Sequence, residues 1–302
     1  MRVGGSVLLP SLIAIAGPTA SGKSALALRL AAERRGTIIN ADASQVYADL
    51  SILSARPTPA EEAAVPHRLF GTIDGARACT AAHWAELAKA AIAEAQGEGR
   101  TPILVGGTGL YLRTLLDGIA PVSPVNAAVR AAIRALPPPE VRAALQAEDP
   151  QMAARLHPND SQRNARALEV WRSTGRSLAA WQQAPAEGGI GAAHAVEAMV
   201  VEIDRATLVE RIDRRVEQMW AEGALDEARQ LAGRHLPPSL PVMRAIGVPP
   251  LLALLAGACT EAEALERWKL DTRQYAKRQA TWMRNQFTHW RRVTPIADSP
   301  AS

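Results

Sequence analysis

Cysteine and long apolar segments are both scarce in this sequence. The 302 residues include two cysteines, Cys79 and Cys259, too few for a disulfide framework or a cysteine-rich metal cluster. This usage is typical of a reducing cytoplasm. No uninterrupted apolar run reaches the roughly 18 residues that a membrane-spanning helix needs. We therefore expect a globular cytoplasmic protein with no membrane segment.

The apolar N-terminal stretch lacks the features of a secretory signal. Residues 1–17 read MRVGGSVLLPSLIAIAG, in which only Arg2 is positively charged and Pro10 interrupts the apolar run. A glycine-rich loop follows at once, which leaves no room for a cleavage site. The stretch therefore predicts a buried first strand.

The net charge of +4 is small, but its distribution along the chain is uneven. Residues 267–292 contain eight Lys or Arg residues and one acid, Asp271. A basic segment of this kind is typical of surfaces that bind polyanions such as nucleic acid.

A phosphate-binding loop is the clearest local motif. Gly17-x-x-x-x-Gly22-Lys23-Ser24 matches the Walker A pattern and lies between an apolar run and a helical pattern. Backbone N–H groups and the positive helix end would receive a diphosphate, Lys23 adds charge, and the Ser24 hydroxyl can hold Mg²⁺. The predicted diphosphate site comprises Gly17, Pro18, Thr19, Ala20, Ser21, Gly22, Lys23 and Ser24.

The fold class predicted from these patterns is α/β, a P-loop NTPase-like parallel sheet flanked by helices. Short apolar runs (SLIAIAG, GTIINAD, TPILVGG and AVEAMVVEID) alternate with helical patterns, which favours parallel strands joined by crossover helices. Prolines and Ala-rich helical segments at residues 120–193 predict an all-helical insertion, with the core at 1–119 and 194–302. After Asp204 we expect helices to the end, with a loose tail after Val293.

The loop does not identify the reaction, because any diphosphate fits it. A nucleotide hydrolase normally adds a strand that ends in Asp, whereas Ile103-Leu104-Val105 ends in Gly106-Gly107-Thr108. Two other strands end near an acid, at Asp42 and Asp204. A small-molecule or nucleotide kinase is therefore one hypothesis, and a non-catalytic RNA-binding protein, suggested by the basic segment, is another.

Five segments in a fixed order resemble the tRNA dimethylallyltransferases, the IPP transferase family. They are GPTASGKSALAL, NADASQVYADL, VGGTGLYLRTLLDGI, HPNDSQRNARALEVW and TRQYAKRQATWMRNQ, from Gly17 to Arg284. The chain has Ala43 where the family has Ser, Leu53-Ser54-Ala55-Arg56-Pro57 for G-T-A-K-P, and Val248 for Tyr in A-I-G-Y. It ends without a Cys/His zinc-finger extension and so resembles the short bacterial form.

The resemblance implies transfer of a dimethylallyl group from dimethylallyl diphosphate to the exocyclic amine of an adenosine. That adenosine is position 37 of tRNAs that read codons beginning with U, and diphosphate leaves. The implied cofactor is Mg²⁺, and the implied partner is the tRNA anticodon stem-loop. Nothing in the sequence demands more than a monomer, so we expect a cytoplasmic monomer.

An aromatic amine is a weak nucleophile and needs its proton removed as it attacks. Asp42, just past a strand end, is the candidate base; the alternative is a magnesium ligand or a helix cap. The resemblance implies that Thr108 hydrogen-bonds the same amine. Lys23 and Arg215 would stabilise the leaving diphosphate. Arg211 and Arg215 share a helix face, and the family pattern selects Arg215, although spacing alone equally allows a solvent-exposed face.

Aromatic and basic residues fall on opposite faces of the basic segment when it is drawn as a helix. Tyr275 and Trp282 lie within about 40° of Trp268, and Arg273, Lys277 and Arg284 lie about 140–180° away. We expect the aromatic face to pack in the core and the basic face to bind tRNA, whose target base must be drawn out of its stack. We assign His67 no catalytic role. The resemblance implies tRNA contacts at Asp42, Ala43, Ser44, Gln45, Thr108, Arg130, Gln162, Arg163, Asn164, Ala165, Arg166, Arg244, Lys277, Arg278, Gln279 and Arg284.

Overall fold

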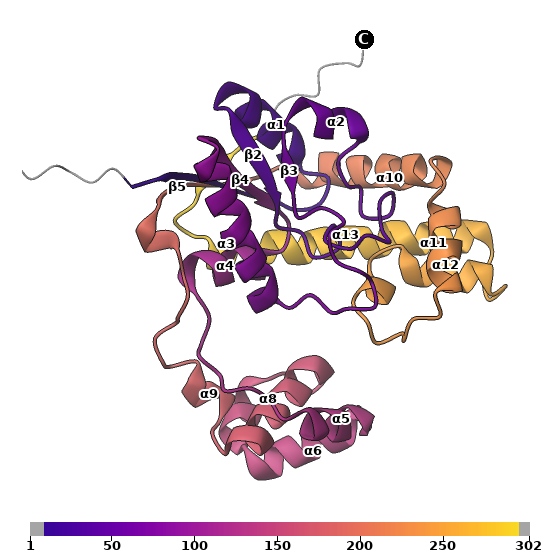
Figure 1. Cartoon of the computed structure of the whole chain (residues 1–302). Coiled ribbons are helices and arrows are strands. Elements are labelled where there is room, and N and C mark those ends of the chain that lie inside the picture. The colour runs from indigo at the N-terminus through magenta and orange to yellow at the C-terminus, as the bar shows by residue number, and fades with distance from the viewer. Residues whose placement is uncertain (1–8, 296–302) are drawn as a thin grey trace, which may run out of the picture. The chain divides into compact units, whose positions relative to one another are not determined.

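A parallel β-sheet organises the computed structural model, which describes residues 9–295 (Figure 1). Within these residues six strands form one sheet in the order β3-β2-β4-β1-β5-β6, and every neighbouring pair is parallel. The strands are β1 (Ser11–Ala16), β2 (Gly36–Asn40), β3 (His67–Arg68), β4 (Thr101–Gly106), β5 (Ala195–Val201) and β6 (Arg291–Val293). The α/β fold class predicted from the alternating patterns is confirmed.

Helices connect and cover the strands. In the part of the chain that contains the sheet they are α1 (Lys23–Glu33), α2 (Pro59–Ala64), α3 (Ala81–Gly97), α4 (Gly109–Asp117), α10 (Arg205–Ala221), α11 (Ala224–Gly233), α12 (Val248–Leu255) and α13 (Glu261–Gln286), with 3₁₀ turns at Gly191–Ala193 and Val242–Arg244. Among the helices of residues 9–295, none is long and apolar enough to cross a membrane.

The core lies on both faces of the sheet, as the buried strand β1 illustrates. Its side chains alternate between the faces because successive residues of a strand point in opposite directions. Leu12, Ala14 and Ala16 belong to the cluster that includes residues of α3, α4 and α13. Ile13 and Ile15 belong to the cluster formed with α1. Burial on both faces explains why the parallel strands read as continuous apolar runs.

Two short strands at the sheet edges differ from the sequence prediction. The expectation of helices from Asp204 onward is wrong at β6, where Arg291–Val293 pairs with Met199–Val201 of β5. β3 pairs residues 67–68 with Ile38 and Ile39 of β2. Neither segment has an apolar run that could have indicated a strand in the sequence. Each is a strand because its backbone pairs with a buried neighbouring strand. The predicted loose tail after Val293 falls largely on residues 296–302, which lie outside the described residues.

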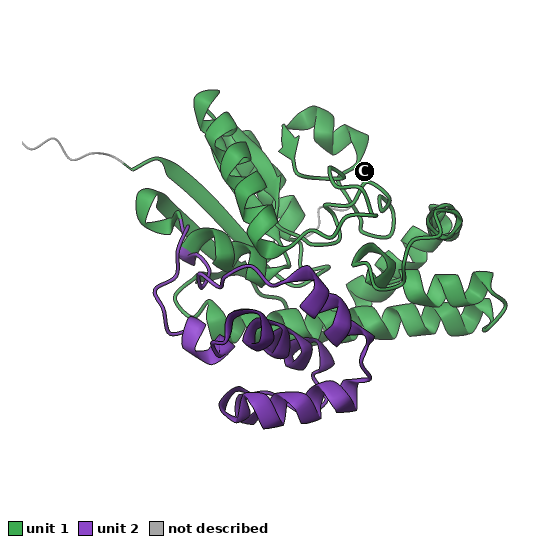
Figure 2. Cartoon of the chain, turned by 60° about the horizontal axis from the view of Figure 1, so that its bottom comes forward, with its two compact units in different colours: residues 1–116, 190–302 green, residues 117–189 purple. Residues whose placement is uncertain are grey.

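The chain divides into two compact units (Figure 2). The core unit, green, extends to Leu116 and resumes at Ile190; the helical unit, purple, is Asp117–Gly189. The insertion was predicted at 120–193, so its observed limits are each three or four residues earlier. The difference has a hydrogen-bonding cause: Ile190 N–H bonds the Leu115 carbonyl within the core unit, and Ile119 and Glu187 exchange two bonds within the helical unit.

Five helices make up most of the helical unit, and an isolated antiparallel bridge between Ile119 and Glu187 joins its two ends. Its helices are α5 (Ala127–Ala135), α6 (Pro138–Glu148), α7 (Pro150–Arg155), α8 (Ser161–Thr174) and α9 (Leu178–Trp181). The sequence offers Asn159 or Asp160 as the N-cap of α8 and Gly175 as its C-terminal cap. Asp160 caps its N-terminus by accepting the Arg163 N–H at 3.1 Å, and Gly175 ends it with a φ of 65°.

Candidate active site

The phosphate loop joins β1 to α1 and has the expected geometry. Gly22, at the N-terminal cap of α1, has a φ of 87°, a left-handed conformation that favours glycine. The Ser21 hydroxyl is buried and has no hydrogen-bond partner within residues 9–295. Lys23 Nζ donates to the Pro18 carbonyl across the loop at 3.2 Å. A buried, unpartnered hydroxyl beside a helix N-terminus is suited to a phosphate oxygen.

Two desolvated cations lie at this loop. Burial lowers the pKa of the Lys23 ammonium to about 8; the Asp42 carboxylate acts in the opposite direction, and the positive charge of Arg215 lowers it further. Burial also lowers the pKa of Arg215, while Asp42 raises it. Crowded, poorly solvated cations are stabilised by an anion placed between them.

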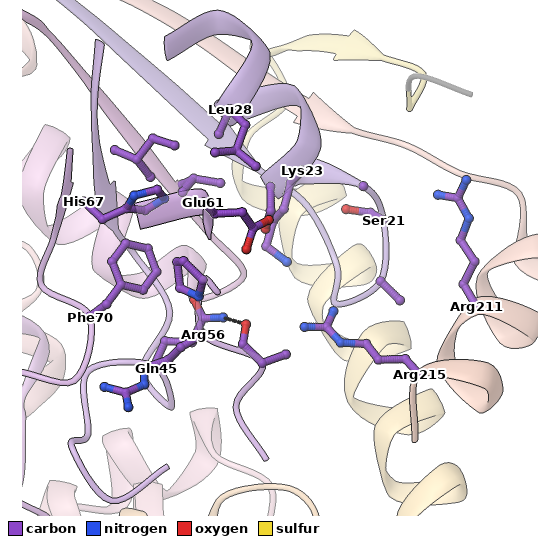
Figure 3. A pocket seen from close by; sticks show the side chains of 18 of the residues that line it. Ser21, Lys23, Leu28, Gln45, Arg56, Glu61, His67, Phe70, Arg211 and Arg215 are labelled. Atoms are coloured by element: carbon purple, nitrogen blue, oxygen red, sulfur yellow. Dashed lines mark hydrogen bonds between the residues drawn. The ribbon is translucent and has the colours of Figure 1, made fainter. Parts of the chain in front are cut away.

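A large cavity lies over the loop (Figure 3). Its volume is about 410 Å³, and Lys23 from α1 and Arg215 from α10 reach it from different walls. The other charged residues of its lining are Arg56, Glu61, Arg211 and Arg214, and His67 lines it as well. His67 contacts the Val65 carbonyl through Nδ1 at 2.9 Å, which agrees with a bracing role. We call this space the charged cavity.

A second, smaller cavity of about 60 Å³ adjoins the first. Ala20, Ala55 and Arg215 line both. Half of its other lining residues are apolar, and the polar half includes Asp42 and Tyr275. The apolar side chains are Leu53, Ile212, Val216, Met219, Ile246 and Trp268. We call this space the apolar cavity; it brings the candidate base next to the diphosphate site.

Asp42 is held by a buried amide two residues earlier. Asn40, fully buried at the end of β2, accepts the Asp42 N–H at 2.8 Å and donates to the Asp42 carbonyl at 3.0 Å. Asp42 Oδ1 accepts the Ser44 N–H at 3.0 Å, which orients the carboxylate. The Trp84 indole in turn donates to the Asn40 carbonyl at 2.9 Å. The base therefore has a fixed backbone.

Thr108 joins the ends of β2 and β4. Its hydroxyl accepts the Ala43 N–H at 2.9 Å, and its own N–H donates to the Ala41 carbonyl at 3.2 Å. Gly106 permits this approach, since a Cβ there would lie 2.1 Å from the Ala41 carbonyl group. Thr108 and Asp42 therefore share one edge of the sheet, as their positions after strands predicted.

Helix α13 contributes two groups to the site that the helical-wheel analysis did not identify. Gln279 is 5% exposed; its Oε1 accepts the Thr19 N–H at 2.9 Å and its Nε2 donates to the Gly107 carbonyl at 2.9 Å. Both ends of the amide are thus engaged within the protein, although the resemblance implied a tRNA contact. Tyr275 lines the apolar cavity, and burial, with Asp42 nearby, raises its pKa. Trp268, on the same face, is 1% exposed and packs in the core as predicted.

Other predicted tRNA residues of the core unit differ in accessibility. Lys277, Arg278 and Arg284 are exposed on α13, and Arg244 is exposed while donating to the Pro238 carbonyl. Arg273, also on the predicted basic face, is paired with Asp213 of α10. A further group surrounds Asp42: Ala43, Ser44 and Gln45 are half-buried, and Gln45 Nε2 donates to the carbonyls of Ser54 and Ala55.

The predicted tRNA residues of the helical unit fall into two groups. Arg130, Gln162, Arg163 and Arg166 are exposed or half-exposed. Asn164 and Ala165 are buried instead, and Asn164 Nδ2 donates to the carbonyls of His157, Pro158 and Asp160. These two residues support the start of α8 and present no side chain to a partner.

The chain matches a known family of proteins. The family model described as IPP transferase matches residues 45–286. The chain belongs to the IPP transferase family. It is 59% identical to the tRNA dimethylallyltransferase of Sphingopyxis alaskensis over 90% of this chain and 89% of that one, and 55% identical to that of Erythrobacter litoralis over 92% and 89%. The resemblance read from the five segments is thus confirmed.

Solved structures of the family have the same fold. The tRNA isopentenylpyrophosphate transferase of Bacillus halodurans is 33% identical, with a TM-score of 0.68 over 95% of this chain and 91% of that one. A eukaryotic dimethylallyltransferase acting on tRNA is 27% identical, with a TM-score of 0.80 over 95% of this chain and 74% of that one. The kinase hypothesis, which rested on the phosphate loop alone, is not favoured by these comparisons.

Proposed function

We propose that this protein transfers a dimethylallyl group from dimethylallyl diphosphate to tRNA, at the exocyclic amine of adenosine 37. The observation that carries the proposal is the junction of the two cavities. One is lined by Lys23, the phosphate loop and Arg215, and the other has an apolar wall from Leu53 to Trp268 and holds Asp42 on its polar side. A molecule with a diphosphate head and a short apolar tail matches this pair, and an amine beside Asp42 would face the carbon between them.

The apolar cavity is the smaller of the two, with a volume of about 60 Å³ beside about 410 Å³ for the charged cavity. A short hydrocarbon group suits it better than a second charged head group does. Leu53, Val216 and Trp268 supply apolar surface around it, which favours a hydrocarbon over a polar group.

The chain's residues divide the reaction between them. As the amine nitrogen bonds to the allylic carbon, the bond from that carbon to the diphosphate oxygen breaks and the amine proton passes to Asp42. Lys23, Arg215 and the loop N–H groups stabilise the negative charge that develops on the leaving diphosphate. Thr108, whose hydroxyl already accepts the Ala43 N–H, has a second lone pair for the amine.

Mg²⁺ is proposed as the ion that accompanies the diphosphate. Within residues 9–295 no group of three His, Cys, Asp or Glu side chains is arranged to hold a metal. The lining of the charged cavity nevertheless includes the Ser24 hydroxyl, and Mg²⁺ is commonly held by substrate phosphates with few protein ligands. Ser24 and the diphosphate oxygens would hold the ion, which would add positive charge to the leaving group.

The RNA partner proposed is the anticodon stem-loop of tRNAs that read codons beginning with U. The exposed basic side chains of α13, Lys277, Arg278 and Arg284, support a phosphate-binding surface in the core unit. Because tRNA is the substrate, we propose that the protein acts in the cytoplasm.

We also propose that the protein is a monomer. Light scattering of the purified protein during gel filtration would measure its oligomeric state.

The direct test is to incubate the protein with dimethylallyl diphosphate, Mg²⁺ and an anticodon stem-loop, and then to weigh the RNA by mass spectrometry. The expected result is the gain of one five-carbon unit. A stem-loop with guanosine at position 37 is the matched control and should gain nothing. ATP hydrolysis without an RNA requirement, together with an unmodified stem-loop, would contradict the proposal and favour a kinase.

A further inference from the structure

Three arginine side chains of the helical unit surround one buried carboxylate. The Glu169 side chain, on α8, is 1% exposed. Arg134 of α5 approaches its Oε1 with Nε at 2.5 Å. Arg130 of α5 and Arg166 of α8 lie 3.9 and 3.8 Å from its Oε2. We call Arg130, Arg134 and Arg166 the arginine cluster.

The arginine cluster carries more positive charge than Glu169 neutralises. Three guanidinium groups face one carboxylate, which leaves two positive charges in excess. Their side chains are 55%, 48% and 41% exposed for Arg130, Arg134 and Arg166, so much of each guanidinium group faces solvent. Burial lowers the pKa of Arg166, Glu169 raises it, and the other two arginines lower it further. Excess charge and planar N–H donors are the chemistry that recognises phosphate.

The position of Glu169 explains how three like charges remain together. Arginine side chains are long and flexible, and without a counter-charge these three would repel one another and turn into solvent. Glu169 is inaccessible to a partner because it lies beneath them. Its carboxylate can therefore act on a ligand only by fixing where the guanidinium groups stand.

We propose that Glu169 is a positioning residue that holds the arginine cluster in the geometry that binds an RNA phosphate, and that Arg134 is one of the phosphate contacts. The resemblance implied RNA contacts for Arg130 and Arg166 but gave no role to Arg134 or Glu169. The inference rests on the proposed function, because the phosphate is that of the tRNA stem-loop.

The variant Glu169→Gln separates positioning from simple charge. It removes a negative charge, so long-range electrostatics alone predicts tighter binding of RNA. Positioning predicts the opposite: the Kd for the anticodon stem-loop rises about tenfold, and the slope of log Kd against log salt becomes shallower by about one counterion. The KM for RNA should rise in the same proportion while kcat at saturating RNA stays unchanged, because α8 carries none of the reacting groups.

Glu148→Gln is the matched control. It makes the same charge change in the same unit, but Glu148 is 33% exposed and its ion pair is with Arg172 alone among the described residues. The RNA affinity of the Glu148→Gln variant should equal that of the wild-type protein or slightly exceed it. If Glu169→Gln, folded by circular dichroism, binds RNA as tightly as Glu148→Gln, the inference is overturned.

Arg134→Gln decides the question if Glu169→Gln does not fold. The side chain of Arg134 is half-exposed, and its loss leaves Glu169 facing Arg130 and Arg166. The expected result is weaker RNA binding with a salt slope shallower by about one counterion. An unchanged affinity and slope would overturn the inference. If the wild-type protein neither binds nor modifies the stem-loop, the proposed function itself is wrong.

Discussion

Gln279 Oε1 accepts a hydrogen bond from the backbone N–H of Thr19, 260 positions earlier in the chain, at 2.9 Å. Through its Nε2 the same amide also holds the Gly107 carbonyl, next to Thr108. One side chain of α13 therefore fixes the phosphate loop and the end of β4 relative to each other. The Thr19 N–H, being engaged, is not among the loop donors that a diphosphate would use.

Gln279→Met keeps the volume of the side chain but removes both hydrogen bonds. The part-buried Thr19 N–H and the buried Gly107 carbonyl would each lose a partner, at a cost of about 1–3 kcal/mol in the free energy of unfolding. We expect the KM for dimethylallyl diphosphate to rise about tenfold, because a loosened loop binds the diphosphate less well. Gln274→Met, at an exposed position of the same helix, is the control. Equal KM values for the two variants would show that the bridge does not support donor binding.

Asp42→Asn tests the proton acceptor with little structural change. An amide oxygen can still accept the Ser44 N–H, but the group can no longer take a proton. We expect kcat for prenyl transfer to fall about 10²- to 10⁴-fold, with the Kd for RNA nearly unchanged. Asp271→Asn, whose carboxylate pairs with Arg267, should leave kcat intact. Full activity of Asp42→Asn would remove Asp42 from the chemistry.

The lowered pKa of Lys23 predicts a dependence of donor binding on pH. Below about pH 8 the ammonium is charged in the free protein, and above it the neutral amine predominates. A bound diphosphate stabilises the charged form, so binding takes up a proton when the pH exceeds the pKa of the free protein. Donor affinity should therefore be full below about pH 8 and fall by up to tenfold per pH unit above it.

Lys23→Arg is the matched variant for this effect, since arginine stays charged across that range. The affinity of Lys23→Arg for the donor should depend less on pH between pH 8 and 10 than that of the wild-type protein. Calorimetry in buffers of different ionisation enthalpy measures both the affinity and the protons taken up on binding. The same steep decline in both proteins would assign the pH dependence to another group.

Lys277→Ala tests the basic face of α13. Lys277 is exposed, and the loss of one phosphate contact should weaken RNA binding and make its salt dependence shallower by about one counterion. Lys269→Ala on the same helix is the control, because Lys269 is paired with Glu217 and Glu266. A fluorescence titration at several salt concentrations gives both slopes. If the Lys277→Ala slope equals that of the unchanged protein, Lys277 is not at the interface.

The elements that the sequence predicts well are those specified by local patterns. The buried strands read as apolar runs, the phosphate loop has its own spacing, and the caps of α8 are visible as Asp160 and Gly175. Strands β3 and β6 are not predictable in this way, because pairing with β2 and β5 creates them.

The parts of the site that depend on tertiary packing were harder to predict. Gln279 falls within about 20° of Trp268 on the helical wheel, which agrees with its burial, but its partners Thr19 and Gly107 follow only from the approach of α13 to the loop. Tyr275 looked like one more core aromatic, whereas the cavity beside Asp42 exposes it. Asn164 and Ala165 belong to a motif whose other members face solvent, and the packing of α8 within the helical unit buries both.

The hydrogen bond from Ile190 N–H to the Leu115 carbonyl has a consequence for modular engineering. This bond joins the two stretches of the core unit at the point where the helical unit is inserted. The strands of the sheet therefore pair without any contribution from the inserted residues. If a short turn replaces residues 117–189, the core unit should still fold, because closing a small loop costs little entropy. Another domain could then be inserted at that turn. The helical unit is thus a separable insertion, which could be exchanged for another without changing the residues of the sheet.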